Sequence, residues 1–130
     1  MKNALIDSKV NFSEIDHINA HGTSTPLGDV VESKAIRELF QESADNIYVS
    51  STKSMTGHLL GAAGAIESIF SILAIKDKVI PPTINLNNPD NEAKLKLVAN
   101  NSIEEKVSFV MNNTFGFGGT NVSLIFKEFE

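Results

Sequence analysis

The chain of 130 residues has no cysteine. This absence excludes disulfides, thiolate metal ligands and a thiol nucleophile supplied by the chain itself. Positive charge is also scarce, because 11 lysines and arginines stand against 16 aspartates and glutamates, for a net charge of −5. Such an acidic chain gains little from the counterion release that drives binding to phosphate backbones. We therefore expect no nucleic-acid partner.

Long hydrophobic runs that would indicate export or membrane insertion are also missing. The apolar run at residues 4–6 is too short for the core of a signal peptide. The longest apolar stretch, residues 59–75, is interrupted by Glu67 and two serines, which favours a buried helix over a membrane span. We expect no membrane segment and a cytoplasmic location.

The composition that is present is globular, with 42% hydrophobic and 21% charged residues. The length suits one domain or a piece of a larger one. Alternating strand-like and helix-like segments predict an α/β fold with a mixed sheet and an antiparallel end. Strands are expected at residues 17–20, 47–49, 95–98 (an edge strand), 107–111 and 122–126. Helical segments are expected at residues 2–8, from Asp29 to about residues 41–45, and at 58–75.

Two details of the longer helices lead to further expectations. Asp29 and Glu32 have the spacing of a capping box, and Glu32 lies off the apolar face that contains Ile36. In the helix at 58–75, Gly61 and Gly64 indicate the close approach of another backbone, since glycine costs about 1 kcal/mol relative to alanine in a helix interior. Because this helix is apolar nearly all round, it should be covered on several sides.

Nearly all the reactive side chains fall in three loops, each of which begins where a predicted strand ends. The loops cover residues 21–28, 51–58 and 113–121. In open α/β sheets the ligand crevice lies outside the carboxyl ends of the strands. If the first two strand–helix units are neighbours, His21 and His58 meet at this edge.

Each candidate residue also has a simpler interpretation. His21, beside a glycine and three hydroxyls, either donates hydrogen bonds to a ligand or is a satisfied histidine in a turn. His58, at or just before a helix start, is either held neutral by the helix dipole and able to donate to an oxyanion, or is a polar residue at a helix start. Lys53 is either solvated or paired with Glu67, whose carboxylate interrupts an apolar helix and needs a cation.

The glycine-rich segment at 116–121 is not a dinucleotide-binding loop, because its spacing differs from G-x-G-x-x-G and a strand follows it. Glycines around an aromatic residue predict a mobile loop that carries a bulky plug and whose backbone N–H groups can serve an oxyanion. The alternative is a tight hairpin with Phe115 and Phe117 in the core. We expect no metal site, since no zinc-protease motif is present and His21 and His58 are 37 residues apart. A serine hydrolase is also not indicated, because the chain has no G-x-S-x-G motif.

Together the loops closely resemble those of the β-ketoacyl-[acyl-carrier-protein] synthases, the condensing enzymes of fatty-acid synthesis. The motifs are NAHGTSTP at residues 19–26, STKSMTGHLLGAAG at 51–64 and FGFGGTN at 115–121, and PPTINL at 81–86 is most similar to the type II elongating class. The match spans residues 1–130 but corresponds only to the C-terminal third of the family. It implies an α/β, thiolase-like fold, present as a partial C-terminal half with a mixed sheet flanked by helices. The nucleophilic cysteine of the family, which lies in the first half, has no counterpart here.

The resemblance implies that His21 and His58 are the two histidines of a Cys-His-His site. In the family these histidines hydrogen-bond the malonyl thioester carbonyl and stabilise the enolate that forms as CO₂ leaves. Lys53 and Glu67 match a structural ion pair. Because initiating synthases have asparagine at the position of His58, primers on acyl carrier protein are favoured over acyl-CoA.

Substrate contacts are implied for a second group of residues. Thr23 and Thr25 match hydroxyls that contact the phosphopantetheine arm of acyl carrier protein. Phe117 matches the gate between acyl pocket and site, Phe115 and Gly118 belong to the same substrate-binding loop, and the N–H of Phe117 matches one oxyanion-hole donor. No bound cofactor is implied, since the phosphopantetheine arm carries the substrate.

The missing part of the family implies partners besides acyl carrier protein. In the family's second half a central strand precedes the first residue of this chain. The strands at 17–20 and 107–113 are therefore expected to be left unbridged, and the apolar helix at 58–75 to be exposed. We expect the chain to pair with a complementary, cysteine-bearing half, to self-associate as the homodimeric family does, or to repack.

Two functions follow from the resemblance. In the first, the chain is a C-terminal piece of a type II synthase that contributes the histidines and the gate, and it is inactive without a cysteine-bearing partner. In the second, it is a non-catalytic remnant or interaction module that keeps the fold surface and binds acyl carrier protein or a subunit.

Overall fold

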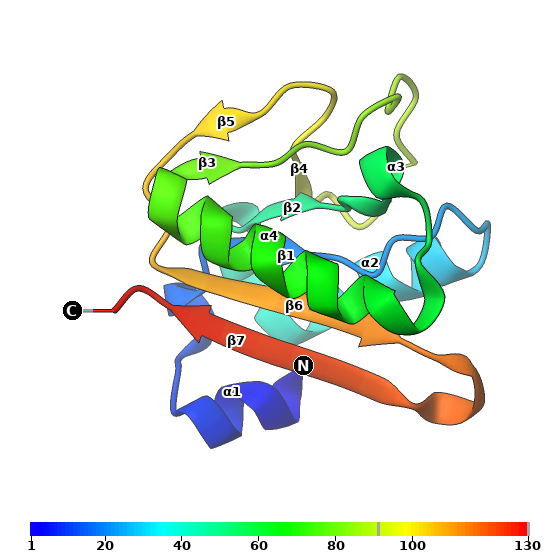
Figure 1. Ribbon diagram of the computed structural model, residues 1–130. Coiled ribbons are helices and arrows are strands. Elements are labelled where there is room, and N and C mark those ends of the chain that lie inside the picture. The colour runs from blue at the N-terminus through cyan, green and yellow to red at the C-terminus, as the bar shows by residue number, and fades with distance from the viewer. Residues whose placement is uncertain (91, 130) are drawn as a thin grey trace.

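The computed structural model describes residues 1–90 and 92–129. Helices and short strands alternate along the chain (Figure 1). The helices are α1 (Lys2–Ser8), α2 (Gly28–Phe40), α3 (Lys53–Thr56) and α4 (Ala63–Asp77), with 3₁₀ turns η1 (Phe12–Glu14), η2 (Gln41–Asp45), η3 (Leu60–Ala62) and η4 (Phe117–Gly119). The strands are β1 (His17–Asn19), β2 (Tyr48–Ser50), β3 (Val79–Ile80), β4 (Lys96–Leu97), β5 (Ile103–Glu104), β6 (Phe109–Phe115) and β7 (Asn121–Lys127).

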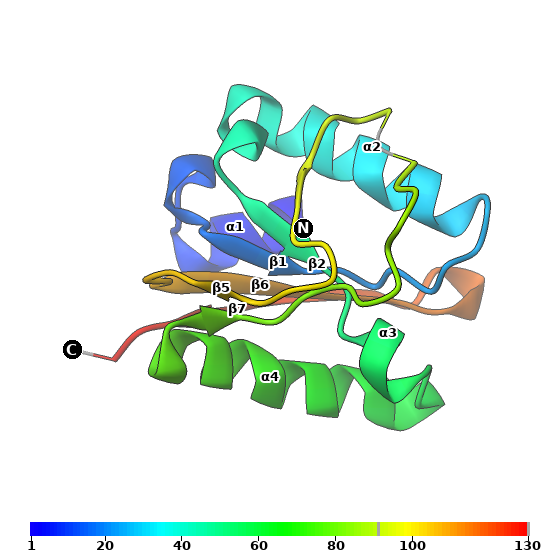
Figure 2. The same ribbon diagram turned by 90° about the horizontal axis from the view of Figure 1, so that it is seen from above.

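Five of the strands form one sheet, in the order β4-β2-β1-β6-β7. The first four run parallel and β7 runs antiparallel to β6. Figure 2 shows the sheet edge-on, with α1 and α2 on one face and α3 and α4 on the other. The predicted α/β fold with a mixed sheet is confirmed, and so is the edge strand within 95–98. The antiparallel ribbon of β3 and β5 is an addition that the sequence did not indicate.

The centre of the sheet corrects one expectation. β1 pairs directly with β6, with His17 opposite Val110 and Asn19 opposite Asn112. The prediction that these two strands are left unbridged is therefore wrong, because their backbone groups satisfy each other and no strand is missing between them. Among the described residues, the edge strands of the sheet are β4 and β7 instead.

Two apolar clusters hold the layers together, one on each side of the sheet. Beneath α1 and α2, Ile18 of β1 packs with Ile36 and Phe40 of α2, all at most 2% exposed. On the other side, Val110 of β6 packs with Ile75 of α4 and neighbouring aliphatic residues. β1 is buried along its whole length although two of its three residues are polar, because His17 lies against the Ser50 hydroxyl and the Asn19 amide donates to Thr52.

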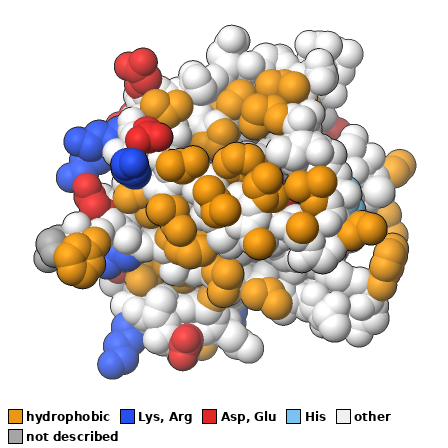
Figure 3. All heavy atoms as spheres, in the orientation of Figure 1, with side chains coloured by type: hydrophobic (Ala, Val, Ile, Leu, Met, Phe, Trp, Pro, Cys, Tyr) orange, Lys and Arg blue, Asp and Glu red, His pale blue; other side chains and the backbone are white. Residues whose placement is uncertain are grey.

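α4 begins later than the sequence predicts. The expected helix at 58–75 starts at Ala63, after a 3₁₀ turn in which Leu60 has a φ of 51°. At Gly64 a Cβ atom would lie 3.1 Å from the Thr114 hydroxyl, so the close neighbour there is a side chain of β6 and not the backbone that was predicted, and Gly61 faces open space. Along the outer face of α4, Ile69 and neighbouring apolar residues are exposed, so within the described residues the helix is uncovered on one side (Figure 3).

α2 also starts differently from its prediction. It begins at Gly28 without a side-chain cap, so the expected capping box of Asp29 and Glu32 is wrong. The Asp29 carboxylate instead accepts a hydrogen bond from the Ser24 N–H at 3.1 Å.

Within the described residues, no helix combines the length and apolarity needed to cross a membrane.

His17 makes the stability of this fold depend on pH. It is fully buried, its Nε2 lies 3.1 Å from the Ser50 hydroxyl, and its Nδ1 has no hydrogen-bond partner among the described residues. Burial lowers the pKa of His17 from 6.5 to about 3. The unfolded chain therefore takes up a proton at this side chain below pH 6.5, whereas the folded chain does not until about pH 3.

We predict that this histidine lowers the free energy of unfolding by up to about 1.4 kcal/mol per pH unit as the pH falls below 6.5. His17→Gln cannot titrate, so its stability should fall less steeply between pH 6.5 and 4.5 than that of the unmodified chain. Urea unfolding at several pH values measures both slopes, and the other titrating groups are common to the two proteins. Equal slopes would contradict the prediction.

Candidate active site

The predicted meeting of the first two loops is confirmed by the geometry. His21 follows β1 and His58 follows α3, which is itself the continuation of β2. Their rings meet edge to face, with centroids 5.6 Å apart and planes at 88°. The parallel pairing of β1 with β2 causes this convergence, because the carboxyl ends of both strands lie at the same edge.

The His21 ring is uncharged at neutral pH. Partial burial, the Lys53 cation and the neighbouring His58 together lower the pKa of His21 from 6.5 to about 4. The Nδ1 atom of His21 is buried without a hydrogen-bond partner among the described residues. A neutral imidazole in this position can donate one N–H to an oxygen that gains negative charge.

The His58 ring is oriented by the backbone rather than by a helix dipole. His58 was expected at or just before a helix start; the 3₁₀ turn η3 begins two residues beyond it and α4 five residues beyond it, so the α-helix starts later than expected. The Leu60 N–H donates to Nδ1 of His58 at 3.2 Å. In the neutral ring this bond places the proton on Nε2. His58 therefore also presents an N–H donor.

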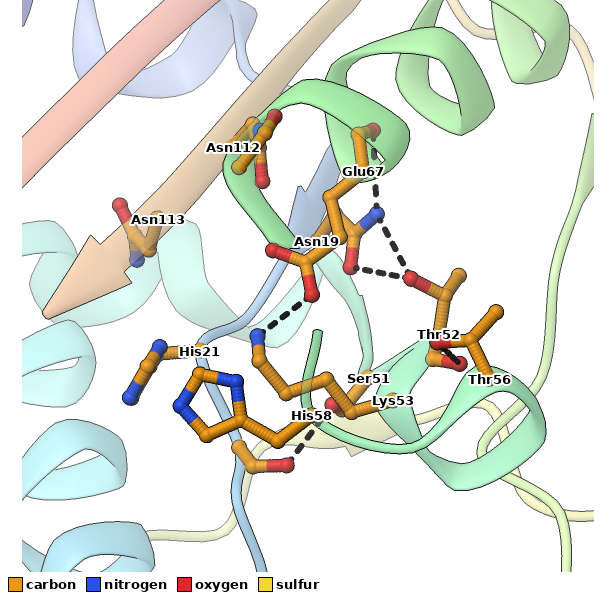
Figure 4. A network of polar contacts seen from close by, with 12 residues as sticks. Asn19, His21, Ser51, Thr52, Lys53, Thr56, His58, Glu67, Asn112 and Asn113 are labelled. Carbon is orange, nitrogen blue, oxygen red and sulfur yellow. Dashed lines mark hydrogen bonds and ion pairs between the residues drawn. The ribbon is translucent and has the colours of Figure 1, made fainter. Parts of the chain in front are cut away.

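A buried ion pair lies behind the two histidines. Lys53 Nζ of α3 is 2.5 Å from Glu67 Oε1 of α4, and the two side chains are 4% and 1% exposed. The predicted pairing of Lys53 with Glu67 is thus confirmed. Burial raises the pKa of Glu67, and Lys53 acts in the opposite direction. Figure 4 shows Lys53 reaching past the imidazoles to this carboxylate.

Buried amides fix α4 on the sheet and so hold Glu67 in place. The Asn19 side chain donates to the Thr52 hydroxyl at 3.3 Å and to the backbone carbonyl of Glu67 at 3.4 Å. The Asn112 side chain, from β6, donates to the Gly64 carbonyl at 3.3 Å. Figure 4 shows both amides beneath the helix.

Glu32 is a site residue that the sequence analysis missed. It is 5% exposed, and its carboxylate accepts the backbone N–H groups of His21 and Gly22, each at 2.9 Å, as well as the Asn113 amide at 3.3 Å. Its predicted place off the apolar face is therefore wrong. The signal was available, because Glu32, Ile36 and Phe40 are spaced four apart on one helix stripe and all are buried.

Burial raises the pKa of Glu32, while its hydrogen bonds to Gly22, His21 and Asn113 oppose that shift. The carboxylate thus joins α2, the loop after β1 and the end of β6. It anchors the backbone that carries the His21 ring.

The hydroxyls of the first loop border a cleft of about 660 Å³. The Thr25 Oγ1 atom accepts the Gly28 N–H at 3.2 Å and lies 3.4 Å from Thr23 Oγ1. Ser51 donates to the Gly22 carbonyl at 2.8 Å and joins the first two loops. Side chains that line the cleft include those of Thr23, Thr25, Lys53 and His58.

The third loop brings one aromatic ring to the site and leaves another outside. Phe115 lies with its ring centroid 5.7 Å from that of His21. Phe117 is fully exposed, so the alternative of a hairpin with Phe117 in the core is wrong. Gly118 and Gly119 have φ angles of 72° and 83°, which side-chain-bearing residues rarely adopt.

Residues 1–87 match the family described as the beta-ketoacyl synthase, C-terminal domain. The chain belongs to the β-ketoacyl synthase family. The family resemblance that the sequence motifs indicated is thereby confirmed, and the relatives and solved structures that follow bear out the type II class and the thiolase-like fold.

Curated relatives of this β-ketoacyl synthase segment carry the name 3-oxoacyl-[acyl-carrier-protein] synthase 2. The protein from Coxiella burnetii is 54% identical over 96% of the chain, and that from Staphylococcus aureus strain COL is 50% identical over all of it. A solved ketosynthase, in complex with a type II PKS acyl-carrier protein, superposes on 99% of the chain with a TM-score of 0.95 and 36% identity. The chain spans 30% and 31% of the two relatives and 32% of that ketosynthase.

We predict that Glu32→Gln loosens the His21 loop of this synthase segment. An amide has one acceptor oxygen, so one of the two backbone N–H groups loses its partner, at a cost of about 1–3 kcal/mol. Amide hydrogen exchange at His21 and Gly22, followed by NMR, should accelerate at least about tenfold. Glu38→Gln, at an exposed position of α2, is the matched control, and equal exchange in the two variants would refute the anchoring role.

Proposed function

We propose that the chain is the C-terminal part of a 3-oxoacyl-[acyl-carrier-protein] synthase II and supplies two histidines for decarboxylative condensation of malonyl-acyl carrier protein with an acyl chain. The observation that carries this proposal is the edge-to-face pair of His21 and His58 beside a buried cation. His58 lines the cleft and the His21 ring lies against it, so the pair can offer two N–H donors to a substrate oxygen there.

The reaction assigns each histidine the same task. The bond between the malonyl carboxylate and the methylene carbon breaks, CO₂ leaves, and the electron pair moves into an enolate whose oxygen becomes negative. The N–H groups of His21 and His58 donate to that oxygen. The enolate carbon then attacks an acyl thioester held on a cysteine, a carbon–carbon bond forms, and the cysteine leaves as a thiolate. Preorganised donors of this kind contribute about 10²–10³ in rate each.

Lys53 contributes to this step in two ways, through the protonation state of His21 and through the stability of the developing oxyanion. Its charge disfavours protonation of His21, whose pKa of about 4 leaves the ring neutral at pH 7. It also adds a favourable field for the developing oxyanion. Glu67 holds Lys53 in position, so the ion pair acts on the reaction through the histidines.

The remaining site residues are proposed to handle the substrate. Thr23 and Thr25, which border the cleft, would contact the phosphopantetheine arm. Phe117 would gate the acyl pocket, and its N–H would complete an oxyanion hole for the acyl thioester. Its full exposure and the glycine conformation at Gly118 support a side chain that is free to swing. Phe115 would close the His21 side of the site.

Two partners follow from this function. Acyl carrier protein would deliver the malonyl group, a proposal supported by the solved ketosynthase in complex with an acyl-carrier protein. Histidine rather than asparagine at position 58 favours primers on acyl carrier protein. Because the chain has no cysteine, a complementary polypeptide would supply the nucleophile, and the chain alone would not condense substrates.

The proposal predicts that activity returns on reconstitution. The chain is mixed with the remaining part of the Staphylococcus aureus relative, and condensation of malonyl-acyl carrier protein with an acyl-acyl carrier protein is assayed. Activity should appear only in the mixture, and His21→Ala or His58→Ala should lower it by about 10²-fold or more.

Lys34→Ala, at an exposed position of α2, serves as the matched control and should leave the activity unchanged. Assembly of a complex that binds acyl carrier protein without condensation would contradict the catalytic proposal. That result would support the second function, an interaction module that keeps the fold surface.

A further inference from the structure

Ser51 stands where three segments of the site meet. It follows β2 directly and precedes α3, the short helix that carries Lys53. Its hydroxyl donates to the Gly22 carbonyl at 2.8 Å, its N–H donates to the Thr83 hydroxyl at 2.8 Å, and its carbonyl accepts the Ser54 hydroxyl at 2.9 Å. Each polar group of this buried residue therefore holds a different part of the chain.

The contact between Ser51 and Gly22 leaves no spare room. A Cβ atom on Gly22 would lie 2.7 Å from the Ser51 Cβ, and the φ of Gly22 is 36°, so only glycine fits there. Gly22 follows His21 in the chain, and its N–H is held by the Glu32 carboxylate at 2.9 Å. The place of Ser51 therefore sets how close α3 lies to the loop that carries the His21 ring.

Thr83 is the fixed end of this junction. Its N–H donates to the Val98 carbonyl and its carbonyl accepts the Asn100 N–H, each at 2.8 Å. Val98 in turn donates its own N–H to the Val49 carbonyl of β2 at 3.0 Å. Because both backbone groups of Thr83 are bonded, its hydroxyl is held at one place beside the end of β2, where the Ser51 N–H meets it.

We propose that Thr83 is a positioning residue for the histidine pair, because its hydroxyl holds Ser51 and so sets the spacing between the His21 loop and the segment from α3 to His58. A second contact joins the same segments, since the N–H of the next residue, Ile84, donates to the Ser54 hydroxyl of α3 at 3.0 Å. The inference rests on the proposed function in one respect, namely that the spacing of the two imidazoles governs condensation.

The spacing matters because hydrogen-bond donors act over a short range and a narrow range of angles. The rings of His21 and His58 are in edge-to-face contact, with centroids 5.6 Å apart, so a shift of α3 separates the two donors. A displacement of about 1 Å at a reacting group can cost about 10² in rate. Donors that act on charge developed in the transition state affect kcat rather than KM when they are displaced.

Replacing the hydroxyl of Thr83 tests the proposal. Thr83→Val keeps the branched shape but leaves the Ser51 N–H without its acceptor, whereas Thr83→Ser keeps the hydroxyl and loses a methyl group. Both are mixed with the remaining part of the Staphylococcus aureus relative and assayed for condensation. Thr83→Val should lower kcat at least about tenfold, with the KM for malonyl-acyl carrier protein changed less than about twofold. Thr83→Ser should restore kcat to within about threefold of the unmodified chain.

Ser51→Ala provides a second variant that cuts the junction elsewhere. It loses the bond to the Gly22 carbonyl and keeps the N–H that Thr83 accepts. It should also lower kcat more than it changes KM. Because Thr83→Val and Ser51→Ala break the same chain of contacts, their effects on kcat in the double variant should be less than multiplicative.

NMR of the isolated chain measures the positioning without any reaction. In Thr83→Val the Ser51 amide should exchange at least about tenfold faster, and the ring proton shifts of His21 and His58 should change as the rings separate. Burial, the Lys53 cation and His58 lower the pKa of His21 to about 4, so this pKa should rise in the variant. Thr83→Ser should match the unmodified chain, and Ser51→Ala carries the same measurement if Thr83→Val does not fold.

The outcomes separate this inference from the proposed function. Unchanged ring shifts and an unchanged pKa of His21 in folded Thr83→Val or Ser51→Ala, or equal kcat values for Thr83→Val and Thr83→Ser, would overturn the positioning role. A mixture in which even the unmodified chain condenses nothing would contradict the proposed function instead. In that case the NMR measurement still decides whether Thr83 sets the spacing of the imidazoles.

Discussion

The ion pair between Lys53 and Glu67 is the interaction on which the rest of the site depends. A carboxylate and an ammonium buried this deeply are stable only because each neutralises the other. The pair fixes α3 against α4, and α3 leads directly to His58. It also places a permanent positive charge beside the imidazoles, and this charge, added to burial, keeps His21 neutral. One contact thus helps to fix the position of the loop that carries His58 and to keep His21 neutral.

Glu32 plays a different part from Glu67 although both are buried glutamates. Glu67 meets a cation, whereas Glu32 meets three neutral N–H donors, two of them from the backbone of the His21 loop. Its partners come from the loop after β1 and from β6, so it joins strands that are neighbours in the sheet. The active-site edge is therefore built from buried polar groups that bond mainly to one another, whereas Nδ1 of His21 has no partner among the described residues. The apolar clusters lie further back, between the sheet and its helices.

The sequence predicted the sheet class, most strands and the meeting of His21 with His58, because these follow from the alternation of elements and the edge rule for parallel strands. It failed where tertiary contacts override local pattern. The start of α4 is delayed because the backbone after α3 turns to orient His58 through Leu60. Glu32 was placed off the apolar face although its spacing with Ile36 and Phe40 puts it on the buried stripe, and its hydrogen bonds to the His21 loop depend on tertiary contacts. The direct pairing of β1 with β6 was missed because strand order is not encoded locally.

The central claim is that the imidazoles of His21 and His58 converge as N–H donors and that His21 is uncharged. Histidine ¹⁵N NMR of the isolated chain across a pH titration tests it most directly. The account predicts that His21 stays neutral from pH 7 down to about pH 4, and that His58 in its neutral form carries its proton on Nε2. Titration of His21 near its ordinary pKa of 6.5, or a neutral His58 protonated on Nδ1, would contradict it.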